Sequence, residues 1–353
     1  MPLFKDKVVV ITGGTGSLGK VLTRRLLARH EDLPRKIIIF SRDEAKQHFM
    51  RAEYQQKQKA TDEIIYQDFG RLVEFRIGDV RNYQSVCSVL DGADIVINAA
   101  ALKQVPSCEY FPYEAVQTNI IGAENIVQAI KINHLPVETV VGVSTDKACK
   151  PINVMGMSKA IQERVFINGN IRTPDTRFIC VRYGNVLASR GSVIPLFHEQ
   201  IKNGGPLTIT TPDMTRFLLS LDRAVDTILA AIDRAQQGET YVPRVPSARI
   251  IDVANALIED RDIDIVTTGI RPGEKVHEIL VSREEAWRTF LRGEYLVIKP
   301  VLPELWQNPG LEAIDQEYSS GDSVLSLEET RNLLMQHNLF INKELNYDGE
   351  FLR

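Results

Sequence analysis

The residues best suited to acid–base chemistry stand side by side at positions 146 and 147. Asp146 and Lys147 belong to the run Ser144-Thr145-Asp146-Lys147, which ends a strand-like stretch over residues 138–144. A carboxyl group and an amine in one partly dry cleft can have pKa values tuned for proton transfer. The run therefore predicts a site of proton transfer. A turn-capping Asp146 and a solvated Lys147 explain the same residues without catalysis.

A methionine and a lysine on the next helix bear on this prediction. Met155 and Lys159 are four positions apart, so they share one face of a helix. A lysine there can donate to the ribose hydroxyls of a nicotinamide cofactor. A tyrosine at position 155 would exchange the proton of a substrate hydroxyl, whereas the thioether of methionine has no titratable proton. Either the chemistry has been lost, or it has moved to Asp146 and Lys147.

A glycine-rich turn near the N-terminus predicts the cofactor. The segment Gly13-Gly14-Thr15-Gly16-Ser17-Leu18-Gly19 follows a buried-strand pattern over Lys7–Thr12 and opens a helical pattern over Leu18–His30. Glycine allows positive φ and lets the backbone approach a pyrophosphate at a helix N-terminus. Any tight strand–helix turn can use glycine. This turn, however, starts an alternating strand–helix pattern, which indicates dinucleotide binding.

The residues after the second strand distinguish NAD from NADP. The strand Lys36–Phe40 is followed by Ser41, Arg42 and Asp43. A hydroxyl and a guanidinium there can bind the 2′-phosphate of NADP, whereas a carboxylate would favour NAD. Asp43 is more simply explained as the N-cap of the next helix. We therefore expect NADP, with a solvated Arg42 and NAD as the alternative.

Further cofactor contacts are expected at the ends of the later strands, where open α/β sheets bind their ligands. Asp79 is placed to hold the adenine, and the small residues after the fourth strand would let the chain pass close under the ribose and diphosphate. Asn119 fits cofactor contact and a hydrogen-bonding role inside its helix equally well. The residues expected from this part of the chain are Asp79, Val80, Ala99, Ala100, Ala101, Asn119, Ser144 and Lys159.

The alternation of strands and helices predicts the fold that positions these residues. Helical segments separate further strand-like stretches at 72–77, 94–98, 138–144 and 177–182. This pattern indicates an α/β fold with a Rossmann-type doubly wound parallel sheet and a smaller C-terminal substrate-binding lobe. We expect the cofactor-binding Rossmann domain over 1–185, the nucleotide-sugar lobe over 186–300 with return segments to the core, and a C-terminal extension with a helix over 301–353.

Two segments outside the core pattern carry predictions of their own. Ser326 and Glu329 have the spacing of a capping box, which predicts an amphipathic helix over Leu327–Gln336. Residues 56–71 predict an extended helix or a surface loop.

Composition and charge exclude several classes of function. The chain has 353 residues, a net charge of −4 and 44% hydrophobic residues, which is ordinary for a soluble globular protein. This charge gives no electrostatic reason to expect nucleic acid or an anionic membrane surface. The longest apolar runs have the length of strands, so no membrane span is expected. The cysteines lack metal-ligand spacing, so we expect reduced thiols, a cytoplasmic protein and no metal.

Several motifs together resemble a known family. They are Thr12–Gly19, Phe40–Asp43, Ala99–Glu109, Ser144–Ala148, Met155–Lys159, Arg182–Val186 and Pro212–Phe217. The combination resembles the extended short-chain dehydrogenase/reductase family. Within that family it is most similar to the bacterial UDP-N-acetylglucosamine 4,6-dehydratases (5-inverting) of capsule, O-antigen and flagellin-sugar biosynthesis. The resemblance runs from about residue 4 to about residue 285, and the glycine motif is its least specific part.

The resemblance implies a route as well as a fold. NADP+ takes hydride from C4 of a UDP-sugar, the C5 proton is removed, water leaves from C6, hydride returns to C6, and C5 is reprotonated from the opposite face. By family analogy Lys147 is the base at C5, Asp146 is the acid at the C6 hydroxyl, and Thr145 hydrogen-bonds the C4 oxygen. The capsule subgroup also has methionine at the tyrosine position, so Met155 fits that subgroup.

The resemblance further implies contacts to the nucleotide sugar. Lys103 would lie on a loop over the sugar, and Arg216 and Glu274 would bind diphosphate and ribose. A surface ion pair for Arg216 and a turn-stabilising role for Glu274 are the alternatives. The implied substrate residues are Lys103, Asn185, Arg190, Ser192, Val193, Thr208, Thr210, Arg216 and Glu274.

Two other functions are alternatives to the dehydratase. A 4-epimerase of the same family returns hydride to the other face of C4 and needs no acid–base pair at C5 and C6. A catalytically silent NADP-binding sensor needs neither the Thr-Asp-Lys run nor an intact nucleotide-sugar half. Segment 286–310 differs from the corresponding segment of the capsule enzymes, so the identity of the sugar stays open. Relatives suggest a homo-oligomer, a hexamer or a dimer, with 56–71 and 286–353 as candidate interfaces.

Overall fold

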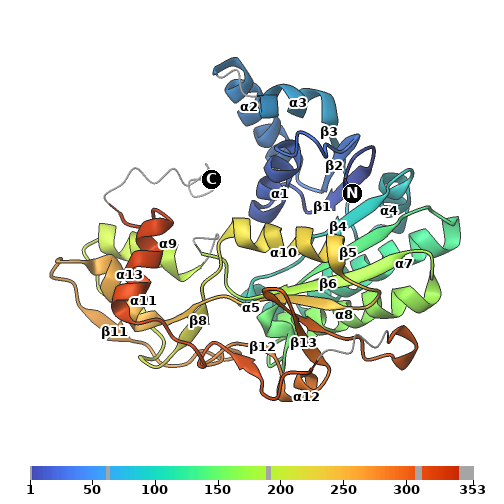
Figure 1. Cartoon of the computed structure of the whole chain (residues 1–353). Helices are drawn as coiled ribbons and strands as arrows, with labels where there is room; N and C mark the ends of the chain where they lie inside the picture. Colours follow the sequence, from blue (N-terminus) through green and yellow to red (C-terminus); the bar gives the residue numbers. More distant parts are fainter. Residues whose placement is uncertain (1, 61–63, 188–191, 307–311, 342–353) are drawn as a thin grey trace.

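A nine-stranded sheet forms the centre of the molecule in the computed structural model, which describes residues 2–60, 64–187, 192–306 and 312–341 (Figure 1). The strands of the sheet are β1 (Val8–Thr12), β2 (Lys36–Ser41), β3 (Val73–Ile77), β4 (Ile95–Asn98), β5 (Thr139–Thr145), β6 (Arg177–Tyr183), β9 (Thr240–Pro243), β13 (Thr289–Arg292) and β14 (Tyr295–Ile298). Their spatial order is β13-β14-β9-β6-β5-β4-β1-β2-β3.

Neighbouring strands from β3 to β9 run parallel, and β14 and β13 extend the sheet as antiparallel strands. Each of the six strands expected from the sequence is present, with ends within one residue of the predicted ones. The predicted α/β class with a Rossmann-type, doubly wound parallel sheet is therefore confirmed.

Helices cover both faces of this sheet, and further helices of the described chain lie beside it. They are α1 (Ser17–Leu27), α2 (Glu44–Ala60), α3 (Ile64–Leu72), α4 (Tyr83–Leu90), α5 (Val105–Tyr110), α6 (Pro112–Ala115), α7 (Gly122–Asn133), α8 (Val154–Arg172), α9 (Val193–Lys202), α10 (Leu221–Arg234), α11 (Ile250–Ile258), α12 (Arg283–Ala286) and α13 (Leu327–Gln336). Short turns of other helix types are the π-helix η1 (Val116–Ile121) and the 3₁₀ helices η2 (Asp146–Ala148) and η3 (Pro303–Leu305).

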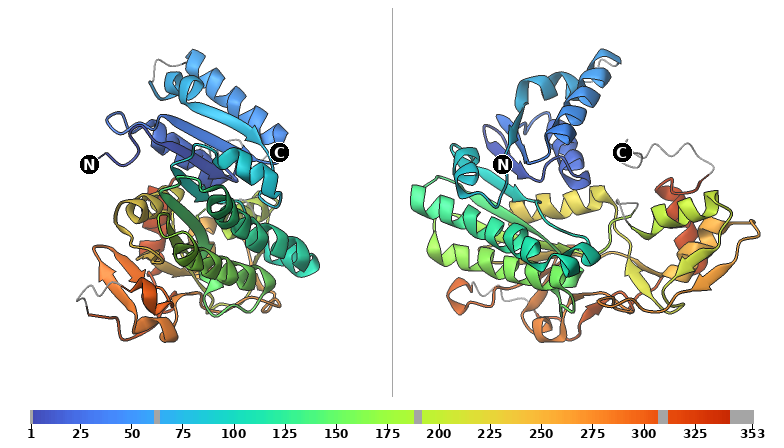
Figure 2. Two further views of the ribbon diagram at one scale, coloured as in Figure 1. Left: turned by 90° about the vertical axis from the view of Figure 1, so that its right-hand side faces the viewer. Right: turned by 180° about the vertical axis from the view of Figure 1, so that it is seen from behind.

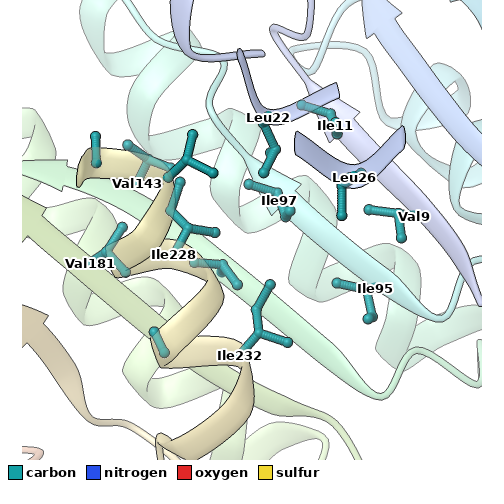
Figure 3. Close-up of a cluster of buried hydrophobic side chains, with 14 of the residues drawn as sticks. Val9, Ile11, Leu22, Leu26, Ile95, Ile97, Val143, Val181, Ile228 and Ile232 are labelled. Atoms are coloured by element: carbon teal, nitrogen blue, oxygen red, sulfur yellow. The ribbon is translucent and has the colours of Figure 1, made fainter. Parts of the chain in front are cut away.

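The alternation of side chains along the strands gives each face its own core. Val9 and Ile11 of β1 point to the face covered by α1 and α10, where they pack with Ile228 of α10 (Figure 3). Val8 and Val10, one position away, point to the face covered by α4, α7 and α8. Successive residues of a strand face opposite sides of a sheet, so one β-branched run serves both layers.

A smaller group of elements packs beside the sheet, as the two views of Figure 2 show. The helices α9, α11 and α13 enclose an apolar core of their own. The short strands outside the main sheet pair as β7 (Leu207–Ile209) with β11 (Ile265–Thr267), β8 (Thr215–Phe217) with β10 (Ser247–Arg249), and β12 (Ile279–Val281) with β15 (Tyr318–Ser319). Strands β9, β13 and β14 belong to the main sheet, so the chain beyond Tyr183 contributes both to that sheet and to the smaller group, which is called the second body below.

Predicted helix ends are also present. Asp43 accepts a hydrogen bond from the amide of Lys46 at 3.0 Å, as expected of an N-cap. Ser326 and Glu329 form the predicted capping box at the start of α13.

The 56–71 segment contains the end of α2 and most of α3, while its residues 61–63 lie outside the described part. In the described part of the chain, no helix has both the length and the apolar character needed to span a membrane.

Candidate active site

A cleft of about 1670 Å³ lies at the carboxyl ends of the parallel strands. Its walls include the glycine-rich turn after β1, the ends of β2, β4 and β5, and, from the loop between β11 and β12, residues 271–274 and 278. The strand order reverses between β1 and β4, which is where open α/β sheets bind ligands. The cleft is larger than the roughly 300–1,000 Å³ of a typical small-ligand pocket, so it has room for two ligands.

Most residues predicted for the site line this cleft. From the predicted cofactor set these are Gly13, Thr15, Gly16, Ser17, Leu18, Gly19, Ser41, Arg42, Asp79, Val80, Ala99, Ala100, Ala101, Ser144 and Lys159. From the predicted catalytic and substrate sets these are Thr145, Asp146, Lys147, Met155, Lys103, Asn185, Ser192, Arg216 and Glu274. The fold thus gathers residues that are far apart in the sequence.

Other predicted substrate residues lie elsewhere. Val193, Thr208 and Thr210 do not line the cleft. The hydroxyl of Thr208 accepts a hydrogen bond from Gln200 at 2.7 Å within the second body. Thr210 donates to Glu274 at 3.4 Å, so it stands behind a residue that does line the cleft. Arg190 falls outside the described residues.

Asn119 is also absent from the cleft lining, and its contacts explain why. Its Oδ1 accepts from the backbone amide of Leu102 at 2.9 Å, and its Nδ2 donates to the Leu102 carbonyl at 3.0 Å. The same Nδ2 donates to Ser158 at 2.9 Å. These contacts match the hydrogen-bonding role inside the helix, one of the two roles left open by the sequence, and they fasten the chain after β4 to α8.

The glycine-rich turn has the shape that a pyrophosphate site needs. Gly13 has a φ of +64°, and a Cβ there would lie 2.8 Å from the backbone of Ala100. A Cβ on Gly19 would lie 2.3 Å from the carbonyl oxygen of Gly14. Gly16, the N-cap residue of α1, provides no side-chain cap for the amides of the first turn. Such amides bind anionic groups, and the residues present fit a dinucleotide.

The end of β2 presents a hydroxyl and a guanidinium to the same cleft. Ser41 lies 3.0 Å from the hydroxyl of Thr15, which ties it to the glycine turn. The side chain of Arg42 is 59% exposed, and its guanidinium lies 3.9 Å from Asp79. Burial acts to raise the pKa of Asp79, but hydrogen bonds from Arg81 outweigh it and lower that pKa. An ionised Asp79 and a largely exposed Arg42 are therefore both available to a ligand.

The residues predicted for proton transfer form a tight cluster at the end of β5. Thr145 donates to Asp146 Oδ1 at 2.7 Å, and Lys147 Nζ lies 3.2 Å from the same oxygen. Asp146 is 1% exposed, whereas the side chain of Lys147 is 22% exposed. On its other side Lys147 Nζ lies 3.1 Å from Glu278 Oε1. Lysine 147 is thus held between two buried carboxylates.

This arrangement determines the charge state of Lys147. Burial acts to lower the pKa of Lys147, but the carboxylates of Asp146 and Glu278 outweigh it, so that pKa is raised above its ordinary value. Lys147 is therefore an ammonium group at neutral pH. Glu278 was missed in the sequence because it follows 131 positions after Lys147, and no local spacing links the two.

Several buried polar atoms in the cleft lack hydrogen-bond partners among the described residues. The seven such side-chain atoms in the described chain include five from cleft-lining residues: Thr118 Oγ1, Asp146 Oδ2, Asn185 Oδ1, Ser192 Oγ and Glu278 Oε2. Buried polar groups in folded proteins are nearly always paired. Their concentration here indicates that the cleft binds a polar ligand.

Met155 and Lys159 lie on α8 against this cluster. Met155 is buried with Cys108 and Ala115 in a small apolar cluster. Lys159 Nζ donates to the carbonyl of Val143 and to Gln162, both at 2.8 Å. Burial lowers the pKa of Lys159 to about 8. The side chain of Ser144 donates to Glu163 at 2.5 Å, so its hydroxyl is engaged within the protein.

The sheet order and the glycine turn before α1 define the class of protein as a Rossmann-type α/β fold. The chain belongs to the polysaccharide biosynthesis protein family, whose model matches residues 9–300. The predicted connection to polysaccharide biosynthesis is therefore confirmed, and the 4,6-dehydratase subgroup stays a prediction.

Known proteins with similar sequences or structures cover nearly the whole chain. A protein named UDP-glucose 4-epimerase from Rickettsia conorii is 44% identical over 345 residues, covering 94% of this chain and 96% of its own. The solved structure of Pen from Bacillus thuringiensis is 34% identical, with a TM-score of 0.84 and coverage of 96% and 99%. DesIV, a dTDP-glucose 4,6-dehydratase from Streptomyces venezuelae, shares the fold at 21% identity and a TM-score of 0.63, over 76% of this chain and 86% of its own.

Proposed function

We propose that this protein is an NADP-dependent nucleotide-sugar 4,6-dehydratase that converts UDP-N-acetylglucosamine to a UDP-2-acetamido-2,6-dideoxy-4-hexulose with inversion at C5. The polysaccharide biosynthesis family and the nucleotide-sugar names of its relatives support the substrate class. The observation that carries the dehydratase is the acid–base pair of Asp146 and Lys147 at the end of β5. A 4,6-dehydration needs such a pair because a proton leaves C5 while a hydroxyl leaves C6.

The hydrogen bonds around Asp146 supply a route for the protons. Thr145 donates to Asp146 Oδ1, so a proton lost by the C4 hydroxyl can pass through Thr145 to Asp146. The carboxyl group formed in this way can give its proton to the departing C6 hydroxyl, which leaves as water. Lys147 rests as an ammonium group, so it must first release a proton to solvent. In the amine form that results, it takes the C5 proton and becomes the ammonium group of the ion pair again. Asp146 is then a carboxylate again.

This route also explains why a methionine can stand at position 155. In this proposal Thr145 and Asp146 do the work of the absent tyrosine, and Met155 packs against Cys108 and Ala115 behind the cluster. The unpartnered atoms of Asn185 and Ser192 support a polar sugar nucleotide beside it. Lys103, Arg216 and Glu274 line the same cleft and are proposed to contact this substrate.

NADP is the proposed cofactor, and when bound it supplies the hydride acceptor and donor. The glycine turn would hold its pyrophosphate and Asp79 its adenine, while Ser41 and Arg42 would face the 2′-phosphate. An Arg42→Ala variant is expected to bind NADP+ about tenfold more weakly, since one charge-assisted contact is lost, and to bind NAD+ as the wild type does. Equal loss for both cofactors in a titration would contradict a 2′-phosphate contact.

A 4-epimerase is the second candidate, because relatives over 40% identical to this chain are named UDP-glucose 4-epimerase. That reaction moves a proton only at the C4 hydroxyl, so it leaves the paired Lys147 and Asp146 without a joint task.

A homo-oligomer, dimer or hexamer, is part of the proposal and is testable by light scattering of the purified protein.

Mass spectrometry of the product tests the proposal. The purified protein is incubated with UDP-N-acetylglucosamine and NADP+, and the product mass is compared with that of the substrate. A product lighter by one water supports the dehydratase. An isomer of unchanged mass supports the epimerase, and an Asp146→Asn variant that kept full turnover would contradict the role of Asp146.

A further inference from the structure

Glu278 belongs to the same cluster although it comes from a distant part of the chain. It lies just before β12, is 2% exposed, and places Oε1 at 3.1 Å from Lys147 Nζ and at 3.8 Å from Arg216 Nε. Its other oxygen, Oε2, is buried and has no hydrogen-bond partner among the described residues. The carboxylate therefore faces the cleft with one oxygen on Lys147 and one unused.

The backbone of Glu278 is held firmly in this place. Its amide donates to Ser320 Oγ at 2.9 Å, and its carbonyl accepts from the amide of Ser320 at 2.8 Å. Ser320 Oγ is in turn 2.7 Å from the hydroxyl of Thr215. These bonds fix the backbone from which the Glu278 side chain extends, and the buried carboxylate is held by its contacts with Lys147 and Arg216.

Charged groups from three segments surround Lys147. Asp146 approaches from η2, Arg216 from β8, and both Lys275 and Glu278 from the loop between β11 and β12. Lys275 donates to the carbonyl of Cys149 at 2.6 Å and Arg216 to that of Val276 at 3.1 Å, so both cations are tied to the backbone. Among the described residues, the carboxylates that pair with the Lys147 ammonium are those of Asp146 and Glu278.

We propose that Glu278 is a positioning residue for Lys147, holding its nitrogen beside Asp146 and making its amine form a stronger base. The inference rests on the proposed function, in which Lys147 removes the C5 proton. In that step the C5–H bond breaks, its electron pair stays with the sugar, and a new N–H bond turns the amine into ammonium. Glu278 stabilises this ammonium at 3.1 Å and takes up no proton itself.

Competitive labelling of Lys147 tests the proposal without any substrate. The full-length protein is acetylated briefly with acetic anhydride over a range of pH, and peptide mass spectrometry gives the pH at which Lys147 is half reactive. In Glu278→Gln this midpoint is expected to fall by about one pH unit, the lower end of the effect of one nearby opposite charge. Glu278→Asp keeps the charge on a shorter side chain and should show a smaller fall.

Glu317→Gln is the matched control, because Glu317 pairs with Lys150 at 2.7 Å and does not line the cleft. In Glu317→Gln, the pH at which Lys147 is half reactive should equal that of the wild type. An unchanged midpoint in both Glu278 variants overturns the inference. Because no turnover is measured, that outcome differs from a failure of the proposed function, which would appear as no dehydrated product from a wild type with the expected labelling.

A kinetic measurement separates positioning from a merely structural role. If the wild type dehydrates UDP-N-acetylglucosamine, the acid limb of its kcat against pH should move to lower pH in Glu278→Gln, with a plateau at least tenfold lower. Glu278→Asp should recover part of both. A fall in kcat with an unmoved acid limb would overturn the inference, because a structural defect alone does not change the titration of Lys147.

Discussion

At the scale of single residues, the proposed chemistry depends on one lysine held between two buried carboxylates. Asp146 and Lys147 could be identified from their residue types and from their place at a strand end. Glu278 could not, because its contact with Lys147 exists only after the chain folds back from the second body. The same holds for Asn119, whose two possible roles were separated only by its bonds to Leu102.

Replacing Met155 and Lys147 tests where the proton transfer takes place. Met155→Leu conserves volume in an apolar cluster, and such changes cost less than about 1.5 kcal/mol of stability. We expect its kcat to stay within about threefold of the wild type. Lys147→Met removes the proposed base and should lower kcat by about a hundredfold or more. The reverse order of the two effects in steady-state assays would contradict proton transfer at the strand end.

The lowered pKa of Lys159 makes the free energy of unfolding depend on pH in the alkaline range. Its pKa is about 8 in the folded chain, against an ordinary value of 10.5. Between these two values the unfolded chain binds more protons at this position, so the free energy of unfolding should rise with pH there. Relative to Lys159→Met, the wild type should gain up to about 3 kcal/mol across this window. Urea denaturation at both ends of the window measures the gain, and a difference independent of pH would contradict the lowered pKa.

At the scale of elements, the cluster is positioned by the close approach of α8 to η2. The first turn of α8 is capped by Asn153, whose side chain accepts from the amide of Gly156 at 2.8 Å. The other end of that side chain donates to the carbonyl of Gly273 at 2.8 Å, which links α8 to the cleft wall. The sequence predicted the strands and the cap at Asp43 because these depend on local pattern. It did not predict the π-helix η1, whose register depends on packing against α8.

Gly156→Ala tests this approach. A Cβ at position 156 would lie 2.2 Å from the carbonyl oxygen of Lys147, so α8 and η2 would have to separate. We expect a loss of about 1–3 kcal/mol in the free energy of unfolding, as for overpacked sites, and a kcat at least tenfold lower. Gly70→Ala, in α3 with open space around the new Cβ, is the control and should be neutral or stabilising. Equal behaviour of the two variants would show that the contact is unimportant.

At the scale of the whole molecule, a buried arginine joins β6 to two helices that are far apart in the sequence, α8 and α12. Arg182 of β6 pairs with Glu163 of α8 at 2.7 Å and with Glu285 of α12 at 2.8 Å. Burial acts to raise the pKa of Glu285, but Arg182 outweighs it and lowers that pKa to about 2. The sequence showed a Rossmann pattern followed by an irregular half. It could not show how β9, β13 and β14 return to the sheet, because that pairing joins distant segments.

Replacing Arg182 tests how much its ion pairs with Glu163 and Glu285 contribute to the free energy of unfolding. Arg182→Met leaves the buried Glu163 without its arginine and leaves Glu285 with Arg288 alone, at 3.3 Å. Removing one partner of a buried ion pair typically costs about 3–5 kcal/mol. Arg234→Met removes an exposed pair with Asp233, for which about 0–1 kcal/mol is expected. Chemical denaturation of the two variants gives both values. A loss for Arg182→Met as small as that of the control would contradict a structural role for this network.

The central claim is that Lys147 and Asp146 carry protons at C5 and C6 of a nucleotide sugar. Its most direct test is a proton NMR time course of the protein with UDP-N-acetylglucosamine and NADP+ in deuterated water. The account predicts a 4-keto, 6-deoxy product that carries deuterium at C5, because the proton removed there is replaced from solvent. An epimerised sugar without deuterium on any ring carbon would contradict it.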